Sequence, residues 1–389
     1  MKVLYFAPTS TLYGDNIALL NILSVLVKEK GVVPYIITSR KGDFTAKLDE
    51  LGYNYSIMHF GWVLWPKLDV FRDYILWLPR IFLYLLWYNS FIYLFFSIKN
   101  IIKEFNPDLI HTNNSCVYTG LIVSKLFGIK HVQHIREFTE LSYGRKYFPS
   151  KKYFFYNLIV KKSNNIFITK QVKKLWNLPN FVSNRVIYDG VFFEKYSIQK
   201  NIEKESYFLY VGRLVEDKGV LDLLEGFNVF CKNNDSVKLK IVGNGDEDYK
   251  KKLEKYVLEN NLLDRVEFLG YRKDVYILME KSMAVFVPSY FEGFGFVPVE
   301  AMINWTLVVA RNTTGIKEQF DNGVEISGAE IGLRFNRNEE ISVLMKEIVD
   351  NGIDYYYPMI KRSQEVVKLY TIEESANKVY SFYCDILKN

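Results

Sequence analysis

Short apolar runs alternate with longer helix-like segments along this chain, and this alternation constrains its fold more than any other feature. In the first half, the apolar run Val3 to Ala7 precedes the loop PTSTLYGDN and a helix-like stretch from Ile17 to Val27, which ends at Gly31. VVPYIIT follows as a second strand, and PDLIHTN and KHVQHIRE indicate later strands with a helix between them. The pattern predicts an α/β fold with a parallel, doubly wound sheet.

The second half repeats this pattern. Strands are predicted at YFLYVG, VKLKIVG, RVEFLG, MAVFVPS and LVVARN, and helices are predicted to begin near Lys218, Asp246, Arg272 and Pro298. A length of 389 residues suits two such domains. The polar stretch EKYSIQKNIEKES, residues 194–206, is the predicted linker. Two doubly wound sheets that face each other predict a central cleft, where ligands bind outside the carboxyl ends of the strands.

Cysteine usage and the N-terminal sequence favour the cytosol. Cys116, Cys231 and Cys384 lie far apart in the sequence, so they indicate neither a disulfide framework nor a zinc site. The sequence MKVLYFAPTS enters a predicted strand without the apolar stretch and cleavage site of a secretory signal. We therefore expect a protein that is not exported.

The stretch FEGFGFVPVEA places two carboxylates, Glu292 and Glu300, on either side of a glycine-containing loop that follows a predicted strand. Gly293 and Gly295 let the backbone approach a ligand closely, and the amides of Phe294 to Val297 can point at an anion near the predicted helix start. The loop is therefore predicted to hold phosphate. Because carboxylates repel phosphate, we expect them to bind hydroxyl groups or a sugar ring beside it.

The stretch VGRLVEDKG supplies the cations that such a site needs. Arg213 ends a predicted strand, and Lys218 stands five residues further on at a predicted helix start. Two cations so placed suit a diphosphate. A nucleotide sugar combines the diphosphate, the hydroxyl groups and the sugar ring that these residues are expected to bind.

These motifs resemble those of family 4 of the retaining nucleotide-sugar glycosyltransferases, and the resemblance is strongest over residues 207–335. Two glutamates that flank seven residues match Glu292 and Glu300, and the family's arginine and lysine pair matches Arg213 and Lys218. In the first half, Gly14 matches the family's glycine loop and His134, in VQHIRE, matches its strand-end histidine. The family fold is GT-B, in which two Rossmann-like, doubly wound domains face a central cleft.

The resemblance assigns domains and roles. Residues 1–195 would form an acceptor-binding, membrane-facing domain and residues 206–370 the nucleotide-sugar-binding domain. Residues 371–389 would form a C-terminal helix, for which packing on the first domain is one option. Glu300 would bind the ribose, Arg213 and Lys218 the diphosphate, and Gly14 would admit the diphosphate close to the backbone. The catalytic candidates are Glu292 and His134, and the donor-binding candidates are Gly14, Arg213, Lys218, Tyr271, Gly293, Phe294, Gly295, Phe296, Val297 and Glu300.

The resemblance also implies that the anomeric configuration is retained, with neither a metal nor a cofactor beyond the donor. The leaving phosphate oxygen would take the proton of the acceptor. Asp189 in RVIYDGV stands where the family usually has Asn. Trp305 and Leu307 replace the usual Gly and Pro after the helix of Glu300, which puts the local packing in question more than the chemistry.

Structural alternatives exist for several of these residues. Glu292 could be an exposed loop acid and Glu300 an acid favoured at a helix start, and neither would then need a ligand. A glycoside hydrolase also uses two carboxylates, but it would leave the cations without a role. His134 could be a core histidine, and Gly14 could serve its turn alone. A dinucleotide dehydrogenase would carry G-x-G-x-x-G after the first strand, which is absent. Acids at 246 and 248 favour helix capping over a metal site.

Charge and apolar patterning in the first half predict a membrane surface. Residues 1–188 hold 24 Lys and Arg against 11 Asp and Glu, and residues 141–188 hold ten Lys and Arg and no acid. Such a surface suits anionic lipid. Single-stranded nucleic acid would also suit it, but no recognition motif supports that partner. Residues 81–98 carry no charge, near the lower length limit of a spanning helix, yet polar residues at helical spacing favour a helix that packs or lies on a surface.

The sequence therefore predicts a cytosolic glycosyltransferase that docks on the inner face of the cell membrane. Its donor would be a nucleotide sugar, with UDP favoured by its frequency in the family and the base held near Gly270 and Tyr271. Its acceptor would be a polyprenyl-linked saccharide of capsule, O-antigen or similar surface polysaccharide synthesis. A soluble enzyme that glycosylates a small metabolite or a protein, and a catalytically silent protein that binds nucleotide sugars or scaffolds a membrane, remain alternatives.

Overall fold

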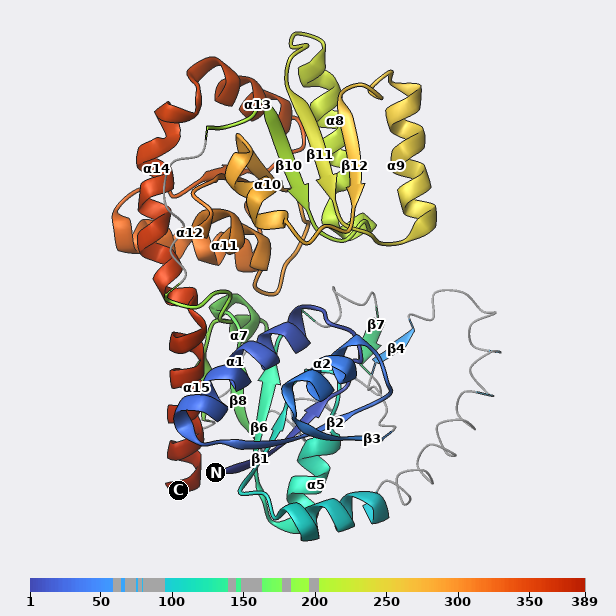
Figure 1. The fold of residues 1–389 in the computed structure, drawn as a ribbon, viewed down its shortest axis with the longest axis vertical. Coiled ribbons are helices and arrows are strands. Elements are labelled where there is room, and N and C mark those ends of the chain that lie inside the picture. The colour runs from blue at the N-terminus through green and yellow to red at the C-terminus, as the bar shows by residue number, and fades with distance from the viewer. Residues whose placement is uncertain are drawn as a thin grey trace. The chain divides into compact units, whose positions relative to one another are not determined.

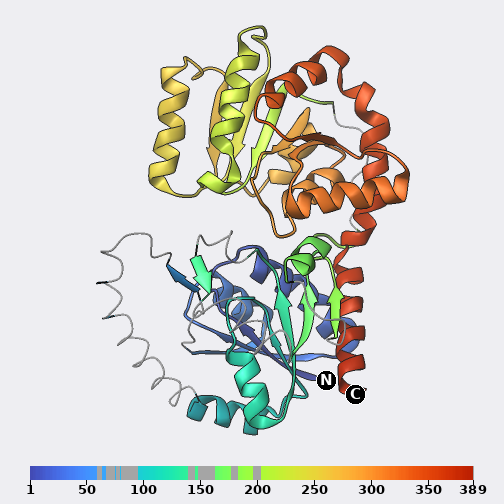
Figure 2. The ribbon, with the colours of Figure 1, turned by 180° about the vertical axis from the view of Figure 1, so that it is seen from behind.

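The chain folds into two α/β units, each with its own parallel sheet (Figures 1 and 2). One unit comprises Met1–Gly190 and Ile372–Asn389, and the other comprises Val191–Thr371. The chain thus enters the second unit once and returns to the first for its last helix. The computed structural model describes residues 1–58, 64–66, 75, 79, 95–138, 145–147, 163–176, 183–195 and 203–388.

In its described part, the first unit contains a seven-stranded parallel sheet in the order β3-β2-β1-β5-β6-β8-β9. The strands are β1 (Lys2–Ala7), β2 (Val33–Thr38), β3 (Asn54–Ile57), β5 (Leu109–Thr112), β6 (Lys130–Ile135), β8 (Asn164–Phe167) and β9 (Asn184–Val186). The helices are α1 (Gly14–Lys30), α2 (Asp43–Leu51), α5 (Thr119–Phe127), α7 (Lys170–Trp176) and α15 (Ile372–Lys388), and residues 95–105 are also helical. A short antiparallel pair joins β4 (Leu64–Pro66) to β7 (Arg145–Tyr147).

Strand β1 has two buried faces, as its continuous apolar sequence predicts. Val3 and Tyr5 belong to the core that includes α1 and α15. Leu4 and Phe6 point to the other face, where they pack with Ile110 and the helical residue Ile98. Side chains of a strand alternate between faces, so β1 links the two cores of the unit.

The last helix, α15, completes the core of the first unit. It lies beside α1 in Figures 1 and 2, although the two helices are far apart in the sequence. Five large apolar side chains of α15 are buried there, namely Ile372, Val379, Phe382, Tyr383 and Ile386. Burial contributes roughly 1.5–3 kcal/mol for each such side chain, and the conformational entropy lost when the helix is ordered offsets part of this gain.

The second unit contains a six-stranded parallel sheet in the order β12-β11-β10-β13-β14-β15 within the residues described. Its strands are β10 (Tyr207–Val211), β11 (Lys238–Val242), β12 (Val266–Gly270), β13 (Ala284–Val287), β14 (Leu307–Arg311) and β15 (Leu333–Phe335). Its α-helices are α8 (Val220–Cys231), α9 (Glu247–Glu259), α10 (Val275–Lys281), α11 (Phe296–Ile303), α12 (Thr314–Ser327), α13 (Glu340–Asn351) and α14 (Ile353–Val366). The strand β15 is the one that the sequence patterns missed, because it has only three residues.

Helix starts in this unit follow local capping chemistry. Asp246 caps α9, where its side chain accepts a hydrogen bond of 2.8 Å from the Tyr249 amide. The predicted helix capping at this position is therefore confirmed. The helix expected near Lys218 begins at Val220 instead, because a 3-10 turn over Glu216–Lys218 precedes it.

Trp305 takes the place of the family's usual glycine and keeps the glycine-like backbone. Its φ is +52°, a left-handed conformation that is uncommon for a bulky residue. Its ring stacks on Tyr357 of α14, with centroids 6.2 Å apart and planes 12° from parallel. Trp305 thus combines a left-handed backbone with a ring packed on α14 at the turn between α11 and β14.

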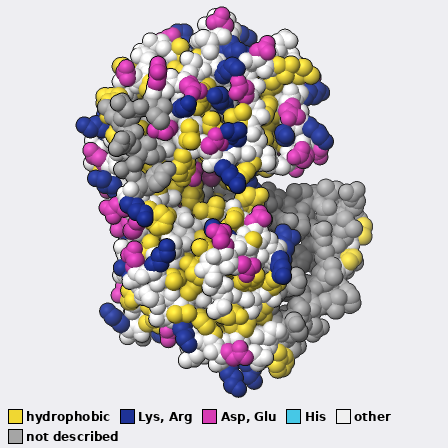
Figure 3. All heavy atoms as spheres, in the orientation of Figure 1, with side chains coloured by type: hydrophobic (Ala, Val, Ile, Leu, Met, Phe, Trp, Pro, Cys, Tyr) yellow, Lys and Arg dark blue, Asp and Glu magenta, His cyan; other side chains and the backbone are white. Residues whose placement is uncertain are grey.

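The segments predicted to meet the membrane lie largely outside the described residues. This holds for 81–94 and for most of 141–162. No helix within the described ranges is both long enough and apolar enough to cross a membrane. On the face of the second unit drawn in Figure 3, basic and acidic side chains are interspersed.

Candidate functional site

The predicted donor residues of the second unit gather at the carboxyl ends of β10 and β13. These strands are neighbours in the sheet, and the strand order reverses between them, since β11 and β12 follow on one side and β14 and β15 on the other. Ligands of doubly wound sheets bind at such a switch point. Lys218 follows β10, and Glu292 and the glycine loop follow β13.

Lys218 and Glu292 form an ion pair at this switch point. The Lys218 Nζ donates a hydrogen bond of 2.6 Å to Glu292 Oε1, and the Ser289 hydroxyl donates one of 3.0 Å to the same oxygen. The side chains are 14% and 22% exposed, so the pair is partly shielded and open to a ligand. Lys218 therefore lies where it can contact both this carboxylate and a bound anion.

Backbone contacts hold the two loops together. The Tyr290 amide donates to the Asp217 carbonyl at 3.0 Å, which ties the loop after β13 to the loop after β10. Arg311, at the end of β14, donates from Nε to the Pro288 carbonyl at 2.9 Å and from Nη2 to Asp222 of α8 at 2.8 Å. These contacts fix the backbone that carries Lys218 and Glu292.

The glycine loop is held from behind by Gln319 of α12. This side chain is 1% exposed, and its Nε2 donates to the carbonyls of Phe294 and Gly295 at 2.8 and 2.7 Å. Because a trans peptide directs its C=O and the next N–H in opposite directions, the amides of Gly295 and Phe296 point away from Gln319. The loop thus presents amides at the start of α11, as expected for a phosphate-binding loop.

Two glycines permit the backbone conformation of this loop and its close contact with α12. Gly295 has a φ of +89°, which L side chains rarely adopt. Gly315, the second residue of α12, lies against the loop. A Cβ at this position would come within 2.5 Å of the Gly293 carbonyl oxygen. The Gly315 amide also donates to the Glu292 carbonyl at 3.0 Å. The start of α12 therefore packs directly against the backbone between Glu292 and Phe294.

Glu300 lies on α11 and faces Tyr276 of α10, whose hydroxyl lies 3.5 Å from Oε1. Burial of the carboxyl group raises the pKa of Glu300 to about 7, and the tyrosine hydrogen bond lowers it by less. A carboxyl with this pKa is available as a hydrogen-bond acceptor near neutral pH. Such an acceptor suits a pair of sugar hydroxyls.

Arg213 and Tyr271 lie at the margin of this site. Arg213 is exposed after β10, and its carbonyl accepts a hydrogen bond of 2.9 Å from the Tyr210 hydroxyl. Tyr271 follows β12 and is 72% exposed. The structure therefore brings Lys218, Glu292 and the glycine loop together, while Arg213, Tyr271 and Glu300 surround them on neighbouring elements.

In the first unit, His134 is the last but one residue of β6 and is buried among polar groups. Its Nδ1 lies 3.3 Å from His111 Nε2 and 3.3 Å from Arg136 Nη2. Its Nε2 has no hydrogen-bond partner within the residues described. Burial, with smaller effects of Arg136 and His111, holds the pKa of His134 well below its usual value, so the ring is neutral.

Asp189, the residue where the family usually has Asn, pairs with Arg136. The Arg136 Nη1 donates to Asp189 Oδ1 at 2.5 Å, and both side chains are at most 5% exposed. Arg136 Nε also donates to Asn113 Oδ1 at 2.8 Å. The acid therefore neutralises an arginine buried beside His134. Burial raises the pKa of Asp189, although Arg136 lowers it.

Gly14 is the first residue of α1, in the loop that follows β1. Asp15 comes next, and its carboxylate accepts a hydrogen bond of 3.1 Å from the Thr9 hydroxyl. Asn113, after β5, donates to the Asp15 carbonyl at 3.0 Å. Since β1 and β5 flank the reversal of strand order in this sheet, Gly14 lies at the switch point of the first unit.

Sequence reasoning missed residues that hold the predicted ones in place. His111 ends the predicted strand PDLIHTN, and the signal that selected His134, a histidine at a strand end, also applied to it. Gln319 and Ser289 carried no such signal, because their roles depend on loops that approach one another only in the fold. Tyr383, which contacts His111, lies 272 residues away in the sequence.

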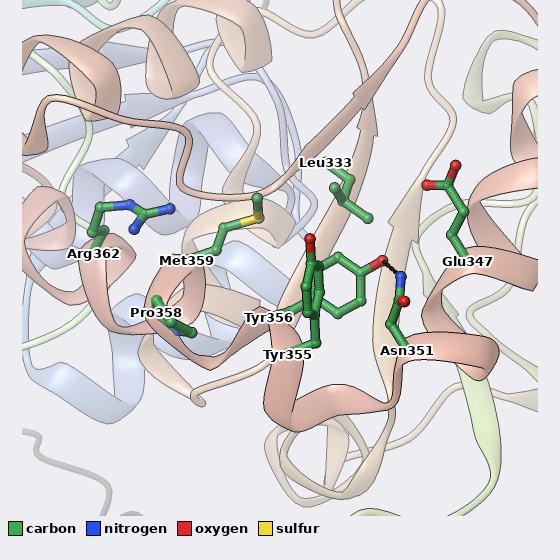
Figure 4. A pocket seen from close by; sticks show the side chains of 8 residues that line it. All are labelled: Leu333, Glu347, Asn351, Tyr355, Tyr356, Pro358, Met359 and Arg362. Carbon is green, nitrogen blue, oxygen red and sulfur yellow. Dashed lines mark hydrogen bonds between the residues drawn. The ribbon is translucent and has the colours of Figure 1, made fainter.

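A separate pocket of about 560 Å³ lies elsewhere on the second unit. Figure 4 shows two tyrosine rings, those of residues 355 and 356, between Glu347 on one side and Arg362 on the other. The Asn351 amide donates to the Tyr356 hydroxyl at 3.4 Å. The pocket lies among α13, α14 and β15, and none of the predicted site residues line it.

Similarity to known proteins identifies the family. The profile of the family described as glycosyl transferases group 1 matches residues 192–365. An uncharacterized glycosyltransferase of Methanocaldococcus jannaschii is 32% identical over 274 residues, which cover 66% of this chain and 72% of that protein. The chain belongs to the group 1 glycosyl transferases.

Two further proteins resemble this group 1 glycosyltransferase over more of its length. The UDP-Gal:alpha-D-GlcNAc-diphosphoundecaprenol alpha-1,3-galactosyltransferase of Escherichia coli is 28% identical over 318 residues, or 72% of this chain and 79% of that enzyme. HepE of Anabaena, solved in complex with UDP-glucose, superposes with a TM-score of 0.77 and 18% identity, over 99% of this chain and 100% of HepE. The fold is GT-B, with two Rossmann-like domains.

Proposed function

We propose that this group 1 glycosyltransferase transfers a sugar, with retention of its anomeric configuration and without a metal ion, from a UDP-sugar to a polyprenyl-diphosphate-linked saccharide. The observation that carries the proposal is the Lys218–Glu292 pair beside the glycine loop, at the switch point of the second sheet. There a cation, a carboxylate and outward-pointing amides are held together.

The donor binds across this switch point. Its diphosphate lies against the amides of the glycine loop and against Lys218, with Arg213 as a second cation. Glu300 accepts hydrogen bonds from the ribose, and Glu292 lies near the sugar. HepE of Anabaena binds UDP-glucose, and the E. coli relative is named for UDP-galactose as its donor. Both support UDP.

Stabilisation of the departing diphosphate is the main catalytic effect. Negative charge develops on the leaving phosphate oxygen, and preorganised donors aimed at such a charge commonly account for the largest part of a rate enhancement. Lys218 and the amides of Gly295 and Phe296 are fixed donors of this kind. They take the role that a divalent cation has in other phosphate-transfer sites, which supports a metal-independent reaction.

The proton of the acceptor hydroxyl passes to the leaving phosphate oxygen in this proposal, so no strongly basic side chain is required. The neutral ring of His134 is consistent with this assignment, because it can donate a hydrogen bond to a substrate oxygen. The first unit would supply the acceptor site and a basic membrane-facing surface. The E. coli relative, named for a diphosphoundecaprenol-linked acceptor, supports a lipid-linked saccharide.

Nucleotide binding is tested first by thermal shift with UDP, GDP, ADP, dTDP and their common sugars. A ligand that binds only the folded protein raises its melting temperature. We expect a shift with the uridine compounds that Glu300→Ala weakens. Glu267→Ala is the matched control, because Glu267 of β12 is paired with Lys238 of β11, away from the glycine loop. A shift with another base alone would replace UDP in the proposal, and no shift with any nucleotide would overturn it.

Transfer is tested with the donor so identified, a polyprenyl-diphosphate disaccharide in detergent, and soluble sugars as competing acceptors. The proposal expects product from the lipid-linked acceptor, the same anomeric configuration in donor and product, and a rate unaffected by EDTA. Product from the soluble sugars alone would favour the enzyme that acts on small metabolites. Flotation with vesicles of anionic lipid at moderate salt tests docking, which fails if the protein stays in the soluble fraction.

A further inference from the structure

Three side chains of the first unit form a hydrogen-bonded chain that ends at His134. The Tyr383 hydroxyl of α15 lies 2.5 Å from His111 Nδ1, and His111 Nε2 lies 3.3 Å from His134 Nδ1. All three side chains are at most 1% exposed. The last helix of the protein thus reaches the predicted catalytic histidine through one intermediate ring.

The protons of this chain can be assigned from its donors and acceptors. A guanidinium only donates hydrogen bonds, so the Arg136 Nη2 that lies 3.3 Å from His134 Nδ1 requires an unprotonated Nδ1. His111 Nε2 faces the lone pair of His134 Nδ1 as well, so this nitrogen of His111 must be protonated. A neutral His111 has a bare Nδ1. The Tyr383 hydroxyl lies 2.5 Å from this nitrogen and 3.4 Å from the Tyr5 hydroxyl, so its single proton is donated to the nearer acceptor, His111.

We infer that Tyr383 and His111 are positioning residues that fix His134 as the tautomer with its proton on Nε2. Each neutral imidazole has one protonated nitrogen, so the order of donors is Tyr383 to His111, His111 to His134, and His134 to a substrate oxygen. In this arrangement the buried Nε2 of His134 holds the one ring proton that the chain of hydrogen bonds does not use. The ring therefore acts as a hydrogen-bond donor and not as a base.

Two further observations support this order. Nε2 of His134 has no partner among the described residues, as expected for a donor reserved for substrate. Burial also keeps the pKa of Tyr383 well above its usual value and the pKa of His111 well below its own. The tyrosine therefore stays a hydroxyl donor, and the histidine stays neutral.

The inference rests on the proposed function only for the substrate oxygen, so its first test needs no activity. Nitrogen NMR of histidine-labelled protein reads the tautomer of each ring directly. The chain has four histidines, and His134→Gln assigns one of them by the loss of its signals. We expect a protonated Nε2 and a bare Nδ1 at His134. A protonated Nδ1 overturns the inference, whether or not the protein transfers sugar.

The second test compares Tyr383→Phe with Tyr380→Phe, which removes a hydroxyl from the same helix without touching the histidines. Tyr383→Phe should mix the tautomers of His111, which it contacts directly, and lower kcat by roughly 3- to 10-fold, the effect of one hydrogen bond. The thermal shift by UDP should not change, because UDP lacks the transferred sugar. Equal kcat and unchanged tautomers in both variants would overturn the positioning role.

His111→Phe serves as a second variant, since it keeps an aromatic ring in the core and removes both hydrogen bonds. We expect a larger loss of kcat than in Tyr383→Phe, because the ring of His134 loses one of its two donors at Nδ1 and keeps only Arg136. A wild-type protein that shows the expected tautomer but transfers no sugar would leave this inference standing and overturn the proposed function. The two failures are therefore distinguishable.

Discussion

Lys218 Nζ lies 2.6 Å from Glu292 Oε1, although the two residues are 74 positions apart in the sequence. One follows β10 and the other follows β13, and these strands are neighbours at the reversal of strand order. The pair is therefore a direct product of the doubly wound topology. It brings the cation of one loop into contact with the carboxylate of another.

Removal of the lysine should impair transfer far more than folding. We expect Lys218→Ala to lower kcat by about 10²–10³, the usual effect of deleting one fixed donor to a developing charge. Stability should fall by about 1 kcal/mol or less, because the ion pair is not fully buried. Lys238→Ala, which breaks an exposed 2.6 Å pair with Glu267, is the control for loss of a lysine. Steady-state kinetics and denaturant unfolding measure the two effects, and equal kcat values for the two variants would contradict the assigned role.

The raised pKa of Glu300 predicts a pH dependence of stability with a definite sign. Its pKa is about 7 in the folded protein against a usual 4.5, so between these values the folded state binds the proton and the unfolded state has lost it. Stability therefore falls as pH rises through this range. The quantity to compare is the unfolding free energy of the wild type minus that of Glu300→Gln. This difference should be constant below about pH 4.5, fall between about pH 4.5 and 7, and be constant again above about pH 7.

The same titration should appear in donor binding. An ionised Glu300 accepts hydrogen bonds from ribose hydroxyls, so the thermal shift by a UDP-sugar, whose diphosphate does not titrate near neutral pH, should grow as pH rises through about 7. In Glu300→Gln the shift should be smaller and independent of pH in this range. A pH-dependent shift that persists in the variant would assign the titration to another group.

Loss of the Gln319 donor should disturb the glycine loop. Gln319→Glu replaces an amide that donates to two carbonyls with a carboxyl group that repels them when ionised, and we expect a loss of about 1–3 kcal/mol in unfolding free energy. The thermal shift by UDP should also weaken, because the loop amides lose their orientation. Gln364→Glu is the matched control, since Gln364 donates to the Met302 carbonyl at the other end of α11. That variant should lose stability and keep the nucleotide shift, and an unaffected UDP shift in Gln319→Glu would contradict the loop-holding role.

Trp305 and Tyr357 should be energetically coupled. Trp305→Gly relieves the cost of a positive φ, roughly 1–2 kcal/mol, but removes the stacked ring, so we expect a net loss of stability. In a Tyr357→Ala background the stack is already gone, and Trp305→Gly should cost less. A double-mutant cycle by denaturant unfolding should give a coupling of about 0.5–1.5 kcal/mol. Additive effects would show that the stack does not compensate for the backbone.

The sequence predicted the fold class and the position of the glycine loop at a strand end because both depend on local patterns. Alternating apolar runs marked most strands, and the Glu292 and Glu300 motif stands directly at the end of one of them. A pattern within one segment cannot show which other loops approach it. Gln319 and Ser289 were therefore missed, although they lie close to the motif in the sequence.

The histidine network was missed for a similar reason. His111 is a lone histidine at a strand end, and its partner Tyr383 belongs to a helix that packs into the first unit after the chain has passed through the second. Asp189 was recognised as an unusual residue. Its role is to pair with Arg136, and no local pattern predicts that this arginine is buried. Long-range pairs between polar residues leave no periodic signal.

The return of α15 to the first unit has a consequence for biosynthesis. The first 190 residues emerge from the ribosome long before residues 372–388, whose apolar side chains complete their core. The unit made first therefore cannot reach its final packing until almost the whole chain is translated. A nonsense mutation shortly before the codon for Tyr383 would damage the packing of the first unit and leave the second unit largely intact.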